Sequence, residues 1–214
     1  MYFIGVDLGQ AGDYTAISVI EANDTGLLIR HLDRLPLGMP YPEQVEHITK
    51  LFNMVHNPVL VIDKTGVGRP VFDLLTMLNP IGLTITGGND ERRDGKNWNV
   101  PKRDLIHGLV IAFQNGNIKI SSALPHAETL IRELTNFKLK VNIRTGHDSY
   151  EAWREGIHDD LVLSVAMAVH VAKNLHKTRG VIVGPTFEQK NDPNYRPRSY
   201  GNKNSRVIIG HGSG

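Results

Sequence analysis

Two adjacent acids, Asp159 and Asp160, open a long run of apolar and small residues that continues as far as Val169. Apart from His170, no ionisable side chain follows until Lys173. Such a run is too long for a buried strand and predicts a buried helix. Acids suit the start of a helix, because free backbone N–H groups and the helix dipole favour negative charge there. Considered by itself, the acid pair fits an ordinary helix start as well as a functional site.

Two further acids each follow an apolar run that predicts a strand. Residues 2–6 lead into Asp7, and the aliphatic residues 59–62 lead into Asp63. The second run is apolar on both faces and follows a predicted helix, so we expect a crossover to a parallel neighbouring strand. Asp7 and Asp63 should then lie at the same end of adjacent central strands. The buried helix can bring its two acids to that end.

The remaining patterns predict an α/β fold with a mixed central sheet flanked by helices. Three antiparallel strands come first and parallel strands follow. The expected strands are 2–6, 15–21, 27–35, 59–62, 83–86 and 118–120. The expected helices are 42–56, 70–78, 102–114, 125–135 and the helix that contains 160–169. Residues 87–100 are polar and predict an irregular segment.

An extra β-hairpin is expected directly before the final helix. Residues 137–144 alternate between apolar and mostly basic side chains. This alternation predicts a strand with one apolar face and one basic face. Residues 145–148 can turn the chain into a second strand at 149–154.

The composition fits one globular domain followed by a tail. The chain has 214 residues, 40% of them hydrophobic, which is enough for one domain with a full core. Residues 1–176 should form this domain. The composition changes at residue 177 and becomes poor in aliphatic residues, so we expect 177–214 to be a flexible basic tail. The chain has no cysteine, which excludes disulfides and thiolate metal sites. No stretch of the sequence has the pattern of a signal peptide or of a transmembrane segment.

Acids gathered at one end of a sheet repel one another, and a divalent cation relieves that repulsion. Carboxylate oxygens suit Mg²⁺ or Mn²⁺. Two such ions about 4 Å apart can clamp a phosphodiester, one activating a water and the other stabilising the leaving 3′ oxygen. No Cys or Ser–His arrangement competes for the role of nucleophile. The candidate metal ligands and catalytic residues are Asp7, Asp63, Asp159 and Asp160.

Four segments carry a resemblance to a known family. They are GVDLGQAGDYTA at 5–16, DKTGVG at 63–68, PKRDL at 101–105 and HDDLV at 158–162. In their order and spacing they resemble the nuclease domain of the tailed-bacteriophage terminase large subunit, over about residues 1–176. The resemblance implies the RNase H-like fold, which that family shares with RuvC-type junction resolvases.

The same resemblance implies a metal-dependent endodeoxyribonuclease that cuts concatemeric viral DNA during genome packaging. It implies two Mg²⁺ or Mn²⁺ ions per site, held by Asp7, Asp63 and the pair Asp159 and Asp160. Family members vary between Asp and Glu at the second of these positions. The implied partners are double-stranded DNA, the terminase ATPase domain, the small terminase and the portal protein, in the host cytoplasm and without a membrane.

A complete large terminase carries an ATPase motor before its nuclease domain. This sequence contains no G-x-x-x-x-G-K-[ST] motif, the phosphate-binding loop of such motors. We therefore expect an isolated nuclease domain, either naturally separate or cut out of a longer protein. The position of Met1 directly before the first strand favours the second origin.

Basic residues in three regions are candidate DNA contacts. The net charge is only +2, from 24 basic and 22 acidic residues, so any basic surface must be local. The helix dipole disfavours a cation at a helix start. A phosphate contact would explain why Lys102 and Arg103 stand at the start of the expected helix 102–114. Like charges along the predicted 137–144 strand also repel without a partner, although a solvated surface explains both groups too. The candidates are Arg92, Arg93, Lys96, Lys102, Arg103, Lys138, Lys140 and Arg144.

Three other functions compete with this one. A RuvC-like Holliday-junction resolvase would have the same fold and chemistry. An actin-like or sugar-kinase ATPase also has a Gly-x-Asp-x-Gly first loop, but it needs a second phosphate loop and a second similar domain, for which this chain is too short. A non-catalytic DNA-binding module would not need all four acids. Metal-dependent plasmid nicking and ATP turnover distinguish these alternatives.

Overall fold

The computed structural model describes residues 1–9, 12–66, 68–143 and 159–176, with the backbone only for 137–143. The predicted tail, 177–214, lies outside the described residues. The strands are β1 Tyr2–Asp7, β2 Ala16–Asn23, β3 Gly26–Arg34, β4 Pro58–Asp63, β5 Ile81–Thr86, β6 Arg92–Asp94, β7 Asn97–Pro101 and β8 Ile118–Ile120. The helices are α1 Tyr41–Met54, α2 Gly68–Leu74, the 3-10 turn η1 Thr76–Leu78, α3 Lys102–Gln114, α4 Ala127–Ile143 and α5 Asp160–Leu175.

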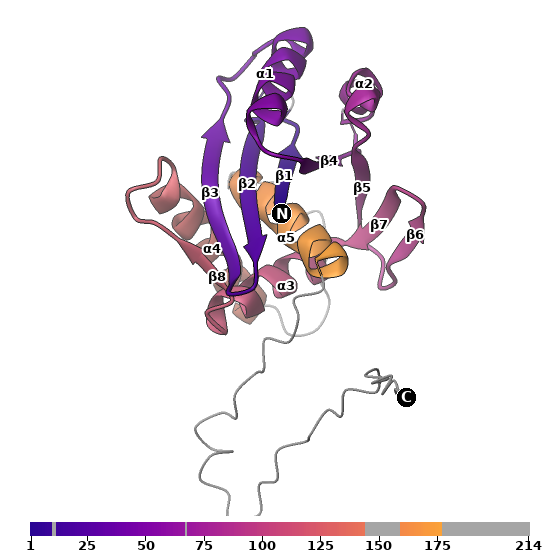
Figure 1. Ribbon diagram of the computed structural model, residues 1–214. Coiled ribbons are helices and arrows are strands. Elements are labelled where there is room, and N and C mark those ends of the chain that lie inside the picture. The colour runs from indigo at the N-terminus through magenta and orange to yellow at the C-terminus, as the bar shows by residue number, and fades with distance from the viewer. Residues whose placement is uncertain (10–11, 67, 144–158, 177–214) are drawn as a thin grey trace, which may run out of the picture. The chain divides into compact units, whose positions relative to one another are not determined.

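The strands form one mixed sheet with the order β6-β7-β5-β4-β1-β2-β3-β8 (Figure 1). The first three strands are an antiparallel meander, and β4 lies parallel to β1 as predicted. β5 and β7 continue the parallel part, and β8 lies parallel to β3 at the other side. The carboxyl ends of β1, β3, β4, β5 and β7 therefore lie along the same edge of the sheet.

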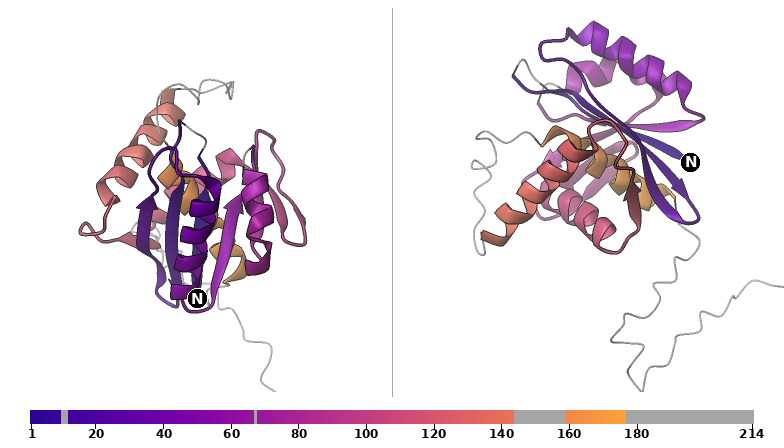
Figure 2. Two further views of the ribbon diagram at one scale, coloured as in Figure 1. Left: turned by 90° about the horizontal axis from the view of Figure 1, so that it is seen from above. Right: turned by 90° about the vertical axis from the view of Figure 1, so that its left-hand side faces the viewer.

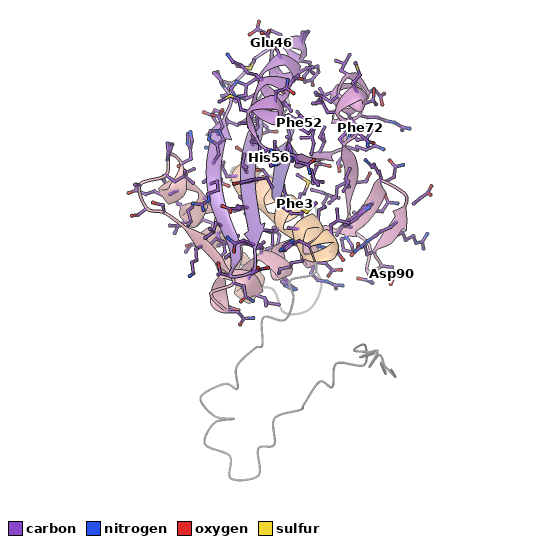
Figure 3. All side chains as sticks on the ribbon, viewed as in Figure 1. Phe3, Glu46, Phe52, His56, Phe72 and Asp90 are labelled. Carbon is purple, nitrogen blue, oxygen red and sulfur yellow. The ribbon has the colours of Figure 1, made fainter. Side chains whose placement is uncertain are left out.

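Helices cover both faces of the sheet, with α1 on one side and α3, α4 and α5 on the other (Figure 2). Side chains alternate between the two layers, as the strand repeat requires. On β1, Phe3 packs in the core beside α5, whereas Ile4 and Val6 pack in the core beside α1. Phe52 and Phe72, from α1 and α2, line that second core (Figure 3).

Helix α5 is the buried helix that the sequence predicts, and it is buried through most of its length. It packs on β1 and β2 and against α3. The contact with β1 is unusually close because Gly5 has no side chain: a Cβ built there would lie 2.1 Å from the backbone oxygen of Ser164. Gly5 lies two residues before Asp7, so this contact holds the start of α5 near the end of β1. In the described residues, no helix is long and apolar enough to cross a membrane.

The prediction of an irregular segment at 87–100 holds for 87–91 and was wrong from residue 92 onward, where two strands form. β6 and β7 make an antiparallel hairpin, with Asp94 opposite Asn97. Gly95 and Lys96 are the two turn residues, and a glycine at the first of them favours such a tight turn because it can take the positive φ, here 55°. The polar composition of 87–100 led to the prediction of an irregular segment in spite of this turn signal. In the described residues, the extra hairpin of the sheet is therefore at 92–101.

The prediction of a strand at 137–144 was also wrong over its described part. Helix α4 continues through these residues to Ile143. The apolar residues explain why: Leu130, Leu134, Phe137 and Val141 are spaced by three or four, which is the repeat of one helix face. The local alternation of 137–143 fits both structures, and the longer helical repeat decides between them. The proposed turn and second strand, 145–154, lie outside the described residues.

Candidate metal centre

Asp7 and Asp63 end two adjacent central strands. β1 and β4 are parallel, and Val6 lies opposite Ile62, so the next residue of each strand is an aspartate at the same level. Both acids follow the alternation of their strands onto the face that α5 covers, since Phe3 and Val61 point to that same core. The predicted juxtaposition of Asp7 and Asp63 is thus confirmed at the level of strand order and register.

The start of α5 supplies the other two acids. Asp160 is the first residue of the helix, and Asp159 is its N-cap residue. The side chain of Asp159 makes no capping hydrogen bond to the helix, although an N-cap aspartate commonly does. The carboxylate of Asp159 therefore does not cap the helix that it precedes.

The electrostatics of Asp7 show that the four acids interact. Burial raises the pKa of Asp7 well above its ordinary value, and the charges of Asp63, Asp159 and Asp160 raise it further. The ammonium group of Lys102 acts in the opposite direction. A buried carboxyl group among three others favours either a proton or a cation.

Asp63 is held in place by the loop that follows β4. Its Oδ1 accepts hydrogen bonds from the backbone N–H and the hydroxyl of Thr65, at 2.8 and 2.6 Å. Burial raises the pKa of Asp63 to about 6, although both hydrogen bonds and the charge of Lys102 lower it. Desolvation therefore outweighs the hydrogen bonds. In the sequence analysis Thr65 appears only within the segment 63–68 and has no role of its own.

Each acid of the pair is bound to a basic side chain. Lys102 Nζ donates to Asp159 Oδ2 at 2.7 Å. Arg34 Nη2 lies 2.7 Å from Asp160 Oδ2. Arg34 was missed by the sequence analysis, but the meander contained the signal: Asp7 lies opposite Ala16, and Ala16 lies opposite Arg34. Arg34 is thus two strands from Asp7, in the same row across the sheet.

Glu133 of α4 is a fifth acid at this centre, and it too was missed. Its Oε1 accepts a hydrogen bond from Arg34 Nη2 at 2.6 Å. Its Oε2 accepts one from the backbone N–H of Val162 at 3.1 Å. Burial raises the pKa of Glu133 to about 7, with Asp160 and Asp159 adding to the effect and Val162 and Arg34 opposing it. No sequence motif marks this residue.

The chemistry of these oxygen donors fits a hard divalent cation such as Mg²⁺ or Mn²⁺. Their present positions are a weaker fit: in the described part of the chain, no three Asp, Glu or His side chains form a group ready to hold a metal ion. One oxygen of each of three carboxylates is engaged by a neighbouring residue: Asp63 Oδ1 by Thr65, Asp159 Oδ2 by Lys102 and Asp160 Oδ2 by Arg34.

Among the predicted DNA contacts, Lys102 alone touches one of the four acids in the described structure. The Arg93 side chain makes contacts within the protein. Its guanidinium lies 4.0 Å from the Trp98 ring centroid and donates to Asn174 Oδ1 at 2.7 Å. Lys96 donates to the carbonyl oxygen of Asn79. The exposed candidates are Arg92, Arg93, Lys96 and Arg103. The side chains of Lys138 and Lys140 and the whole of Arg144 lie outside the described parts of the structure, so their DNA contacts stay predictions.

Known proteins resemble this chain in sequence and in structure. The curated terminase large subunits of Thermus virus P23-45 and Thermus phage G20c are each 30% identical to it over 168 residues. This match covers 78% of the chain and 31% of each relative, so the chain spans about a third of their length. Among solved structures, the magnesium-bound large terminase nuclease of phage G20c matches with a TM-score of 0.55 and 25% identity, over 79% of this chain and 80% of that one.

A zinc-bound structure of the same G20c nuclease matches with a TM-score of 0.53 and 25% identity, over 79% of this chain and 80% of that chain. The family model of the terminase RNase H-like domain matches residues 4–171, which include all four aspartates and the sheet between them. The chain belongs to the family of terminase RNase H-like domains.

Proposed function

We propose that this chain is a divalent-metal-dependent endodeoxyribonuclease, the nuclease part of a large terminase, which cuts concatemeric viral DNA during genome packaging. The observation that carries the proposal is the convergence of Asp7, Asp63, Asp159 and Asp160 at one edge of the sheet. The raised pKa of Asp7, which is caused by burial and by the other three acids, supports it. The magnesium-bound and zinc-bound structures of the G20c nuclease support it as well.

In this proposal Asp7, Asp63, Asp159 and Asp160 hold two Mg²⁺ or Mn²⁺ ions. When bound, such ions supply a nucleophilic water at neutral pH and stabilise the charge that develops on the leaving oxygen. The chain's own part is to hold the four carboxylates near one another in a buried site. Thr65 orients Asp63, and the close packing of α5 on β1 keeps the acid pair near Asp7.

Binding of double-stranded DNA would depend on local basic residues, because the net charge of the chain is only +2. Lys102 is well placed for a phosphate contact, since its ammonium group lies 2.7 Å from Asp159 at the edge of the centre. Arg92, Lys96 and Arg103 are exposed and would contact the phosphates of the same duplex farther from the acids. Such contacts carry little sequence information, so cleavage should depend weakly on sequence.

The wider role follows from family membership and is part of the proposal. The ATPase motor, the small terminase and the portal protein would be the protein partners, and the host cytoplasm would be the place of action. Membership of the terminase family favours this role over a junction resolvase or a sugar-kinase ATPase.

A plasmid digest tests the proposal. Purified protein is incubated with supercoiled plasmid in Mg²⁺, Mn²⁺, Ca²⁺ or EDTA. We expect nicked and linear products with Mg²⁺ or Mn²⁺ and none with EDTA. Asp7→Asn should abolish cleavage, whereas Asp24→Asn, in the exposed turn between β2 and β3, should not change it. Cleavage in EDTA, or normal cleavage by Asp7→Asn, would contradict the proposal.

A further inference from the structure

The first turn of α5 is capped by a residue from another helix. In an ordinary N-cap, the side chain of the cap residue accepts a hydrogen bond from the backbone N–H two or three positions into the helix. Asp159 occupies the cap position but makes no such bond. The N–H three positions on belongs to Val162, and it donates to Glu133 Oε2 of α4 at 3.1 Å, from 29 residues away in the chain.

Because Glu133 takes the capping role, the side chain of Asp159 can contact other partners. A carboxylate that caps its own helix is turned back onto the backbone N–H groups. Asp159 instead reaches Lys102 Nζ at 2.7 Å, toward the carboxyl edge of the sheet. Glu133 thus satisfies the helix start with an acid that is not part of the predicted ligand set.

Glu133 also fixes Asp160 through Arg34. One guanidinium nitrogen, Arg34 Nη2, contacts both Glu133 Oε1 at 2.6 Å and Asp160 Oδ2 at 2.7 Å. The three side chains are largely buried, with relative exposures of 15% for Arg34, 5% for Glu133 and 7% for Asp160. The guanidinium also lies over the ring of Tyr14, whose centroid is 4.5 Å from Arg34 Cζ. Burial makes such a charged contact costly to break.

We propose that Glu133 is a positioning residue of the nuclease centre: it caps α5 in place of Asp159 and, through Arg34, orients Asp160, so that both acids of the pair face the cations. This inference rests on the proposed metal-dependent function. Glu133 itself does not touch the metal or the DNA. Its contribution is the placement of two carboxylates that begin the same helix, each held by a different contact.

The test measures the Mn²⁺ requirement of the full chain in two ways. One is the Mn²⁺ concentration that gives half of the maximal rise in melting temperature, and the other is the concentration for half-maximal plasmid cleavage. Partners that orient metal ligands typically change metal affinity or activity about 10–100-fold when removed. We expect Glu133→Ala to raise both concentrations by that factor. Glu133→Gln should lie between, because its single amide oxygen can serve either Val162 or Arg34 but not both.

Two variants on the same helix are the controls. Glu128→Gln changes an exposed acid in the first turn of α4 and should leave the Mn²⁺ requirement unchanged. Leu134→Val alters the buried neighbour of Glu133 and should lower the melting temperature without a matching rise in the Mn²⁺ requirement. A purely structural role for Glu133 predicts that its variants behave like Leu134→Val.

The outcomes separate this inference from the function on which it rests. If the wild type shows no Mn²⁺ response and no cleavage, the proposed function fails, and the inference fails with it. If the wild type responds and Glu133→Ala has the wild-type Mn²⁺ requirement, only the inference is overturned. Should Glu133→Ala not fold, Glu133→Gln decides the question in the same way, and a wild-type requirement there overturns the inference.

Discussion

Asp7 lies in a group of acids whose negative charge exceeds the positive charge beside it. Five carboxyl groups take part, those of Asp7, Asp63, Asp159, Asp160 and Glu133, and they face two basic side chains, Arg34 and Lys102. Burial adds to the imbalance, because a carboxylate loses its water there. Burial raises the pKa of Asp7, Asp63 and Glu133, and the charges of neighbouring acids raise the pKa of Asp7 and of Glu133 further. Protons and divalent cations should therefore compete for this centre.

This competition predicts how stability depends on pH. The folded protein keeps protons on Asp63 up to about pH 6 and on Glu133 up to about pH 7, whereas the unfolded chain releases them near pH 4 to 5. The contribution of these two groups to stability is therefore fully present below that range and is lost as the pH rises to about 7. We expect a lower melting temperature at pH 8 than at pH 5 in EDTA.

Asp63→Asn should reduce this loss of stability, because the variant has no charge at that position to desolvate. The shift from 3.8 to about 6 would correspond to roughly 3 kcal/mol at most. The comparison is the difference in melting temperature between pH 5 and pH 8 for the wild type, for Asp63→Asn and for the exposed control Asp24→Asn. An equal difference in all three proteins would show that Asp63 does not cause the effect.

The contact between β1 and α5 sets the distance from Asp7 to the acid pair. Gly5 and the backbone of Ser164 meet there, and Ser164 Oγ lies 3.4 Å from the carbonyl oxygen of Gly5. A Cβ on Gly5 would lie 2.1 Å from the Ser164 oxygen, so α5 would have to move away from the strand. This movement would separate Asp159 and Asp160 from Asp7.

Gly5→Ala should therefore weaken both the fold and the Mn²⁺ response. Overpacking of a tight core typically costs about 1–3 kcal/mol. Chemical denaturation measures the first effect, and the Mn²⁺-induced rise in melting temperature measures the second. Gly88→Ala is the matched control, because only a threonine hydroxyl lies near the added Cβ, at 3.9 Å. A Gly5→Ala protein with wild-type stability and a wild-type Mn²⁺ response would contradict the role of this contact.

Elements with a strong repeat could be predicted from sequence, and ambiguous short ones could not. The apolar runs of β1 and β4 and the long run of α5 each have one consistent interpretation, and the structure has all three. Residues 137–143 fit a strand locally, and only the longer repeat of α4 reveals the helix. The hairpin of β6 and β7 depends on one glycine turn within a polar segment.

The centre itself could be predicted only in part, for a reason that concerns the whole domain. Asp7 and Asp63 stand at the ends of two strands that the crossover predicts to be neighbours. Their position at the same end of adjacent strands could therefore be deduced from the sequence. Arg34 requires the register of the meander, and Glu133 requires the packing of α4 against α5, which no sequence pattern specifies. Long-range packing thus determines how the acids are held, whereas local sequence determines which acids are present.

The topology gathers residues that lie far apart in the chain. The carboxyl ends of β1, β3 and β4 bring Asp7, Arg34 and Asp63 to one edge, and α3, which follows β7, begins with Lys102. Helix α5 then crosses this sheet with its N-terminal acids at the same edge. The proposed ligands come from the start of the chain, Asp7 and Asp63, and from the helix α5 near its end, Asp159 and Asp160. Because an ion would bind residues from both regions only in the folded state, Mn²⁺ should stabilise the whole fold by mass action.

The most direct test of the metal centre is anomalous diffraction from crystals of the wild-type protein soaked in Mn²⁺. We predict anomalous peaks at the carboxyl edge of the sheet, within bonding distance of Asp7 and Asp63 and of at least one of Asp159 and Asp160. Two ions about 4 Å apart would match the two-metal mechanism. The absence of a peak at these acids, or Mn²⁺ bound only elsewhere, would contradict the assignment of this centre.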